Sequence, residues 1–146
     1  MRKGFTLLEL MVVIIILGVL ATLGVMQYQA AIEKSRGAEP RQIIGQLRSQ
    51  CAAIFMADGN TTNCTSGNLG LDTTGACLAD MIPNAACCGT HFFTYAVGGL
   101  GGSTATYTAT RCIAGGKSPD GTTANTLGLA TDYAAGTDVW SSTGGY

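Results

Sequence analysis

Residues 5–26 read FTLLELMVVIIILGVLATLGVM, an apolar run that determines the first structural element of the chain. The run has one charged residue, Glu9, and no proline. At 1.5 Å per residue its roughly 22 residues form about 33 Å of helix, enough to cross the hydrocarbon core of a bilayer. Arg2 and Lys3 precede it, and such residues stay on the cytoplasmic side. The sequence therefore predicts a membrane-spanning helix, with the remainder of the chain facing outward.

The composition is low in charge, because only 12% of the 146 residues are charged. Soluble domains average about 25%, and the apolar run explains the shortfall. The net charge is −1, and beyond residue 48 two basic residues stand against six aspartates. A protein that coats nucleic acid carries a basic surface, so no nucleic-acid partner is expected. The length is typical of one domain.

Glu9 distinguishes this run from a plain signal peptide or a plain single-span anchor. A carboxylate one turn into a membrane helix is costly, so it indicates a function and requires a partner. The run is also long for a signal peptide, and no small-x-small cleavage site follows it. Residue 5 lies one turn before Glu9 on the same helix face. If the chain began at Phe5, its α-amino group would be a partner at that depth.

The residues on both sides of Glu9 combine a basic leader, a glycine, a phenylalanine and a carboxylate at fixed spacing. They read Lys3-Gly4-Phe5-Thr6-Leu7-Leu8-Glu9-Leu10-Met11-Val12-Val13-Ile14, followed by Gly18. This pattern resembles the N-terminus of type IV pilins and the related pseudopilins, with a class III prepilin signal, over about residues 1–36. The resemblance implies that residues 1–4 are a leader. A prepilin peptidase would cut between Gly4 and Phe5 and methylate the new amino group.

The same resemblance implies a route from membrane to filament. The precursor would be a single-pass protein of the inner membrane. With the pilus assembly machinery, the mature subunits would stack their first helices into a helical homopolymer on the cell surface. Glu9 would neutralise the Phe5 amine of a neighbouring subunit, because a buried charge is tolerable when it is paired and hydrogen-bonded. No cofactor is expected.

The helix is expected to become amphipathic as it continues to residue 57. Residues 5–28 form the hydrophobic half, and residues 29–57 are rich in helix-forming Ala, Glu, Lys, Arg and Gln. Gly37 and Pro40 predict a bend, and Gly59 suits a left-handed helix end. Apolar residues at steps of three and four predict a stripe that packs on a core: Ile43, Ile44, Leu47, Cys51, Ile54 and Phe55.

The chain after the helix predicts a small head. Residues 58–90 lack periodicity and are expected to form a cross-linked connecting loop. Residues 91–146 are expected to form antiparallel β-structure, with Phe93, Tyr95 and Val97 facing the helix stripe. The expected strands are 91–97 and 105–113, joined by the glycine-rich turn 98–103, and two weaker ones, 126–131 and 138–142. The fold class is therefore α+β, a long N-terminal helix packed on a small antiparallel sheet.

Six cysteines lie in the outward-facing part of the chain, and an even number in an oxidising compartment predicts three disulfides. Adjacent Cys87 and Cys88 seldom join each other, but many pairings remain open. A hairpin centred near Leu100 would bring Cys88 close to Cys112, which is the pair we favour. Cys51 would then reach Cys64 across the end of the helix, and Cys77 would take Cys87.

Other motifs give weaker signals. The stretch Cys87-Cys88-Gly89-Thr90-His91 lacks the C-x-x-C-H spacing of a haem site, and zinc would need reduced thiols. Asn60-Thr61-Thr62 and Asn63-Cys64-Thr65 match N-glycosylation acceptors, which are common in threonine-rich chains. Asp120, Asp132 and Asp138 lack the spacing of a calcium loop. The sequence predicts no catalytic, metal or phosphate site.

The predicted function is structural rather than enzymatic: a subunit of a type IV pilus-like surface filament. One alternative is a pseudopilin of a type II secretion system, although the chain lacks the Tyr-Pro-rich segment of major pseudopilins and has six cysteines. Another is a minor pilin with an adhesive or DNA-binding role, although the head is small and acidic. A third is a membrane-tethered domain that never polymerises.

Overall fold

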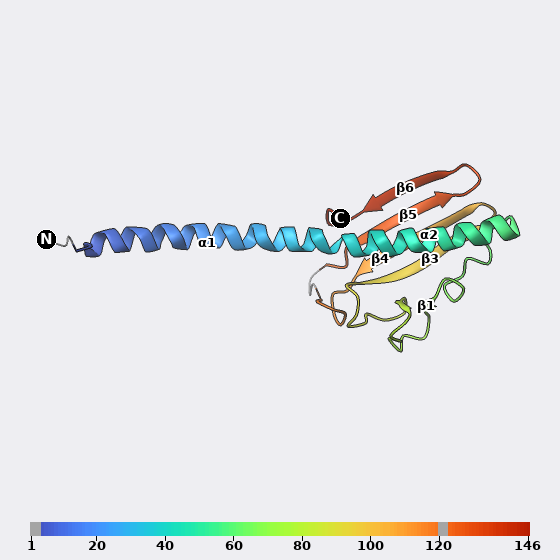
Figure 1. Cartoon of the computed structure of the whole chain (residues 1–146), viewed down its shortest axis with the longest axis horizontal. Helices are drawn as coiled ribbons and strands as arrows, with labels where there is room; N and C mark the ends of the chain where they lie inside the picture. The colour runs from blue at the N-terminus through green and yellow to red at the C-terminus, as the bar shows by residue number, and fades with distance from the viewer. Residues whose placement is uncertain (1–3, 120–122) are drawn as a thin grey trace. The chain divides into compact units, whose positions relative to one another are not determined.

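The computed structural model describes residues 4–119 and 123–146 of the chain. They form two compact units, one that ends at Ser35 and one that comprises Arg36–Tyr146. The first unit is helical. In the second, a helix is followed by a short parallel strand pair and a four-stranded antiparallel sheet (Figure 1).

Helix α1 (Leu7–Arg36) contains 30 residues, about 45 Å at 1.5 Å per residue, and none of them is buried. Among the described residues, the helical stretch Leu7–Asp58 holds the single candidate membrane span by length and composition. The large apolar side chains of α1 are exposed on every side, which is typical of a helix surrounded by lipid or by other apolar helices. The predicted apolar helix is confirmed, and its insertion into a membrane stays a prediction.

Gly37 separates α1 from helix α2 (Ala38–Asp58). Pro40 is the third residue of α2, where the helix has no earlier carbonyl to accept the N–H that proline lacks. The proline is therefore compatible with the helix that follows it. The predicted bend near Gly37–Pro40 falls at the boundary between the two units, and it stays a prediction.

Helix α2 carries the predicted apolar stripe. Ile43, Ile44, Leu47 and Cys51 are buried, and Ile54 is partly buried against the same core. The helix ends at Asp58, where Gly59 adopts a left-handed backbone (φ 72°) and its N–H donates to the carbonyl of Phe55 at 2.8 Å. The predicted glycine end is confirmed.

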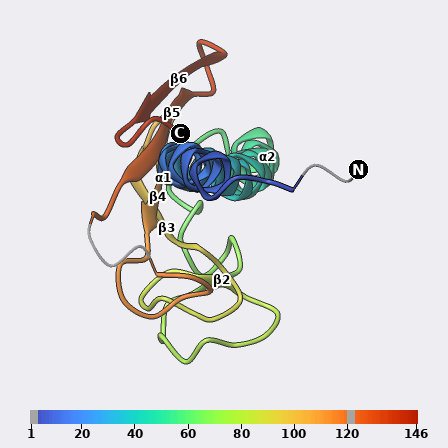
Figure 2. The ribbon, with the colours of Figure 1, turned by 90° about the vertical axis from the view of Figure 1, so that its left-hand side faces the viewer.

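The sheet contains β3 (Phe93–Gly101), β4 (Thr104–Arg111), β5 (Thr126–Asp132) and β6 (Thr137–Ser142), in that spatial order. In β4, whose sequence is TATYTATR, the buried residues alternate with threonines on the opposite face. Tyr107 lies opposite Val97 and Leu129, at the centre of the core. Helix α2 covers one face of the sheet (Figure 2), so the predicted α+β fold is confirmed.

Two details of the head differ from the sequence-based expectation. Strand β3 continues through Gly98 to Gly101, with an irregular register between them, so the predicted turn 98–103 is too long. Gly99 and Gly102 allow this because both have φ 59°. The expected loop also contains a parallel strand pair, β1 (Leu71–Asp72) and β2 (Ile82–Pro83). Strands of two residues are too short to produce a periodic pattern.

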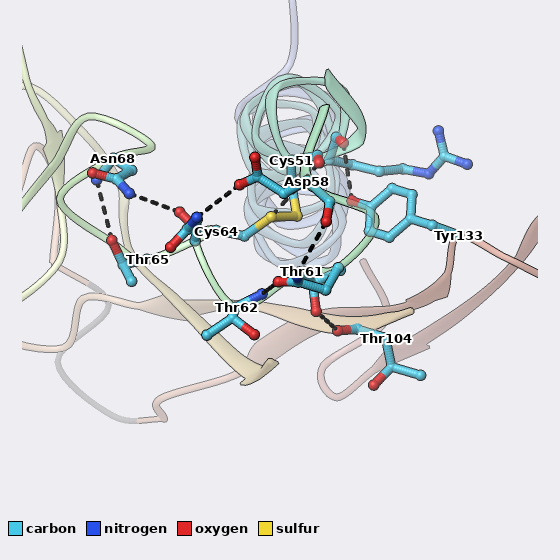
Figure 3. The surroundings of a disulfide bond; sticks show 12 residues. Cys51, Asp58, Thr61, Thr62, Cys64, Thr65, Asn68, Thr104 and Tyr133 are labelled. Atoms are coloured by element: carbon cyan, nitrogen blue, oxygen red, sulfur yellow. Dashed lines mark hydrogen bonds between the residues drawn. A yellow bond between two sulfur atoms is a disulfide. The ribbon is translucent and has the colours of Figure 1, made fainter. Parts of the chain in front are cut away.

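The disulfide Cys51–Cys64 joins α2 to the connecting segment, as predicted. Figure 3 shows its surroundings, where the hydroxyl of Thr61 donates to the carbonyl of Thr104 at 2.6 Å. The hydroxyl of Tyr133 donates to the carbonyl of Arg48 at 3.0 Å and accepts from the hydroxyl of Tyr107 at 2.6 Å. These bonds attach the end of the helix to β4 and to the segment after β5.

The other two predicted pairs were wrong, because the structure joins Cys77 to Cys88 and Cys87 to Cys112. The hairpin register does bring this region to Cys112, since the Cys112 N–H donates to the Phe92 carbonyl at 3.0 Å. Cys87 and Cys88 lie outside the strands, and adjacent side chains leave the backbone in different directions. Spacing alone cannot tell which of two neighbours faces Cys112.

Asp72 organises the connecting segment. Its side chain is buried, and one carboxylate oxygen accepts hydrogen bonds from the backbone N–H of Thr74 at 2.9 Å and of Gly75 at 3.2 Å. The hydroxyl of Thr74 also donates to it. These bonds, led by the Thr74 hydroxyl, hold the pKa of Asp72 below its ordinary value.

Asp72→Asn should lower the stability of the head at neutral pH, and its deficit should shrink in acid. Because the folded pKa is lowered, the stabilisation is complete above the unfolded pKa and is lost as pH falls through the folded pKa. Urea unfolding of the wild type and the variant between pH 7 and pH 2 measures this. A deficit that stays constant down to pH 2 would contradict the role of the ionised carboxylate.

Candidate functional site

The start of α1 is built around Thr6 and Glu9. The backbone N–H and the hydroxyl of Thr6 each donate to Glu9 Oε2 at 2.9 Å, and the Glu9 N–H donates to Thr6 Oγ1 at 3.3 Å. Thr6 precedes the first helical residue, Leu7, and Glu9 is the third residue of the helix. This reciprocal arrangement is a capping box, which satisfies backbone donors that the first helical turn leaves without partners.

Glu9 therefore has a local partner that the sequence-based argument did not include. The structure joins Glu9 to Thr6, while Gly4 and Phe5 lie exposed just before the helix. The sequence contains a signal for this contact, because a threonine followed three residues later by a glutamate before an apolar run is typical of a capping box. The carboxylate thus sits at the helix N-terminus, where the helix dipole also favours negative charge.

The surface behind this cap is apolar along most of α1. Phe5 and the large hydrophobic side chains from Leu7 to Tyr28 are exposed, and Phe5 retains 88% of its accessible surface. Contiguous apolar surface of this extent is rare on monomeric soluble proteins and indicates contact with membrane or protein. Burying one such side chain away from water contributes about 1.5–3 kcal/mol of stabilising free energy.

Two charged residues of the head have roles that sequence reasoning missed. Glu39 Oε1 accepts from the hydroxyl of Tyr95 at 2.9 Å and from the backbone N–H of Phe92 at 3.0 Å, which ties the first turn of α2 to β3. Burial raises the pKa of Tyr95, so its hydroxyl stays a donor. Arg111 is 1% exposed, and its guanidinium donates to the carbonyl of Phe92 at 2.9 Å and to that of Ser118.

The remaining candidate residues have structural contacts. Asp132 accepts from the backbone N–H groups of Ala134 and Ala135, and Asp138 bonds to the guanidinium of Arg48 at 2.9 Å. All six cysteines are in disulfides. Within residues 4–119 and 123–146, no group of three His, Cys, Asp or Glu side chains could hold a metal ion. Asp120 lies outside the described residues, as do Arg2 and Lys3 of the leader.

Comparison with known proteins finds a match for this N-terminal segment. Residues 1–25 match the family model described as the prokaryotic N-terminal methylation motif. The chain thus carries the class III prepilin signal, and the resemblance to type IV pilins is confirmed.

The similar proteins are fimbrial proteins. Fimbrial protein Q of Moraxella bovis is 39% identical over 82 residues, which cover 51% of this chain and 50% of that protein. Type IV major fimbrial protein FimA of Dichelobacter nodosus is 34% identical over 67 residues, 46% of this chain and 42% of FimA. A probable minor fimbrial protein of the same organism is 44% identical over 62 residues, 40% of this chain and 36% of that protein.

The chain spans about half the length of the curated relatives it matches. These relatives are structural fimbrial proteins, which agrees with the prediction of a structural protein rather than an enzyme.

Proposed function

We propose that this protein is the structural subunit of a type IV pilus-like filament on the cell surface. The observation that carries the proposal is α1: a 30-residue helix with no buried residue, whose first part lies within the methylation motif of residues 1–25 and whose start is capped by the carboxylate of Glu9. The fimbrial names of the relatives support the same role.

The apolar surface of α1 suits both the membrane-bound precursor and the assembled filament. In the precursor, α1 rests in the inner membrane, where hydrocarbon replaces water around its apolar side chains. On assembly it leaves the lipid and packs against the same helix of other subunits, so its apolar surface stays out of water in both places. The head, which has polar residues and three disulfides, faces outward.

Processing creates a positive charge on the new N-terminus, and Glu9 neutralises it. Cleavage between Gly4 and Phe5 by a prepilin peptidase leaves an amino group on Phe5, which the same enzyme methylates. In the filament core this cation needs a partner, because an unpaired buried charge is strongly destabilising. Glu9 of a neighbouring subunit supplies the negative charge, and the hydrogen bonds from Thr6 fix where its carboxylate points.

Sheared surface filaments should contain this chain with N-methylated Phe5 as its first residue. Electron microscopy establishes that filaments are present, and mass spectrometry of their N-terminal peptide identifies the cleavage site and the added methyl group. A strain that lacks the prepilin peptidase is the control and should keep the leader on an unassembled membrane protein. Intact Met1 on monomers in the wild type would instead indicate a membrane-tethered domain.

A minor subunit is the second candidate, because the probable minor fimbrial protein of Dichelobacter nodosus is 44% identical over its matched region. The same preparation distinguishes the two. A major subunit accounts for most of the filament protein, whereas a minor subunit accounts for a small fraction of it.

A further inference from the structure

The three disulfides of the head differ in their exposure to solvent. All six cysteines lie in the described part of the chain, and of these Cys77 alone is an exposed residue. Its partner Cys88 is 4% exposed, while Cys51 and Cys64 are both completely buried. A thiolate breaks a disulfide by attacking one of its sulfur atoms, so the rate depends on access to that sulfur. The Cys77–Cys88 bond therefore offers an external thiol an exposed residue to attack, and the Cys51–Cys64 bond offers none.

The Cys87–Cys112 bond is shielded by the chain that follows it. Cys112 is 1% exposed, and Cys87 is half-buried. Gly115 and Gly116 pass close to both residues. A Cβ built on Gly116 would lie 3.2 Å from Cys112 Sγ, and one built on Gly115 would lie 3.5 Å from the Cβ of Cys87. This bond is therefore less accessible than the one at Cys77.

Cys77 also has a backbone conformation that its residue type rarely adopts. Its φ is 55°, and it is the one non-glycine residue among the described residues with a positive φ. A side chain with a Cβ disfavours this left-handed region, so the conformation persists only where the surrounding structure imposes it. The bond to Cys88 is one such restraint. Opening that bond allows Cys77 to return to a common conformation, which favours the open form, and exposed or strained disulfides are the more easily reduced ones.

The loop that contains Cys77 is held at its base by other contacts. Residues 73–81 lie between β1 and β2, which pair with each other. Asp72, at the end of β1, accepts hydrogen bonds from the N–H groups of Thr74 and Gly75. From residue 73 to residue 80 every residue except Gly75 is exposed. Loss of the Cys77–Cys88 bond should therefore release this loop from the segment at Cys88 and leave the strand pair and the helix–sheet core in place.

We propose that the Cys77–Cys88 bond is a site of reversible thiol–disulfide exchange with external thiols, while the other two bridges persist. This inference goes beyond the filament function and does not depend on it. The thiolate of an external monothiol attacks Cys77 Sγ. The bond between Cys77 and Cys88 breaks, a mixed disulfide forms on Cys77, and Cys88 leaves as a thiolate that takes a proton from water. Attack of the Cys88 thiolate on Cys77 Sγ reverses the step and releases the external thiol.

A dithiol carries the exchange one step further. Its second thiolate attacks its own sulfur in the mixed disulfide, so the dithiol is oxidised to a disulfide and Cys77 leaves as a thiolate. The two electrons that the dithiol gives up reduce the bridge to two thiols. A monothiol thus attaches a group to the head at Cys77, and a dithiol opens the bridge. Both changes alter the exposed surface at residues 73–80.

Limited reduction of the full-length chain in a neutral detergent tests the site. Dithiothreitol is added for increasing times, and N-ethylmaleimide then labels the thiols. Peptic digestion in acid suppresses further exchange because the thiols are protonated, and mass spectrometry locates the labels. Cys77 and Cys88 should be labelled about tenfold faster, or more, than the other four cysteines. Earlier or equally fast labelling of Cys87 and Cys112 would overturn the proposal.

Two controls separate the folded structure from the local sequence. In concentrated urea the three bridges should be reduced at similar rates, because the differences in exposure and the restraint on Cys77 are lost. A preference for Cys77 and Cys88 that persists in urea would overturn the structural cause. Cys77→Ser/Cys88→Ser should lack the fast phase of labelling. A fast phase that remains in this variant would show that another bridge is the reactive one.

Reduced glutathione tests which sulfur is attacked. We expect a mixed disulfide on Cys77, and removal of the glutathione should restore the Cys77–Cys88 bond. Fragmentation of the peptides distinguishes Cys77 from Cys88 and Cys87. Glutathione found on Cys88 instead of Cys77 would overturn the assignment of Cys77 as the attacked residue.

Discussion

Glu9→Gln should be cleaved and inserted into the membrane normally, yet should reduce filament yield more than tenfold. Glutamine fits the same capping box, because its amide oxygen can accept the hydrogen bonds that Thr6 donates to Glu9 Oε2. It removes only the negative charge. Loss of one partner of a buried ion pair costs about 3–5 kcal/mol, and about 1.4 kcal/mol corresponds to a factor of ten. Filament yield is measured by shearing and quantifying the subunit against its membrane pool.

Thr6→Ala is the matched control for this variant. It removes the capping hydroxyl, which costs about 1 kcal/mol, and leaves the Glu9 carboxylate. We expect filament yield to fall by less than Glu9→Gln lowers it, and Glu9→Ala, which loses both functions, to be the most defective. Normal yield from Glu9→Gln together with a severe defect in Thr6→Ala would show that Glu9 acts as a helix cap and not as a counter-charge.

Replacing Cys87 and Cys112 together by serine should destabilise the head by about 3–4 kcal/mol. The bond closes a loop with a sequence separation of 25, and the chain-entropy treatment assigns about 3.5 kcal/mol to a loop of that size. The loss should be larger than this treatment gives if the connecting segment detaches from β3. Urea unfolding of the full chain in detergent, followed through the near-ultraviolet signal of its aromatic residues, measures the change.

Cys77→Ser/Cys88→Ser serves as the comparison for that variant. Its bond has a sequence separation of 11, so the same treatment gives a smaller loss of about 2.8 kcal/mol. Both double variants keep Cys51–Cys64 intact and leave no unpaired cysteine. An unfolding midpoint equal to the wild type in Cys87→Ser/Cys112→Ser would contradict a stabilising role for the Cys87–Cys112 bond.

The long-range layout of the fold could be predicted because it depends on patterns that extend over many residues. The apolar run in α1 is continuous, while the stripe from Ile43 to Cys51 and the alternation of Phe93 and Tyr95 repeat at the helix and strand periods. Each period specifies which face is buried, and the faces can pack in only a few ways. The end of α2 at Gly59 could also be predicted, because few residue types other than glycine adopt the left-handed backbone conformation.

The local contacts could not be predicted where several residues of one type compete for a partner. Cys87 and Cys88 are neighbours, and only the path of the backbone decides which one reaches Cys112. Glu39 and Arg111 resemble surface charges in the sequence. In the structure, Glu39 accepts hydrogen bonds from Tyr95 of β3 and from Phe92, which precedes β3, and Arg111 is buried. The contact of Thr6 with Glu9 is predictable from sequence, because a threonine three residues before a glutamate at a helix start is typical of a capping box.

The three disulfides also limit how far the head can lengthen under tension. From Cys51 to Cys112 the polypeptide has 61 peptide steps, about 200 Å when drawn straight. A force transmitted through the sulfur bridges takes a shorter path, from Cys51 to Cys64, along the backbone to Cys77, across to Cys88, back one residue and across to Cys112. That path contains 14 peptide steps, about 50 Å, and three bridges with Cα–Cα distances of 5.3, 5.3 and 5.8 Å, so it is about 65 Å long. While the three disulfides remain oxidised, a subunit under tension can therefore separate Cys51 and Cys112 by no more than the length of this shorter path.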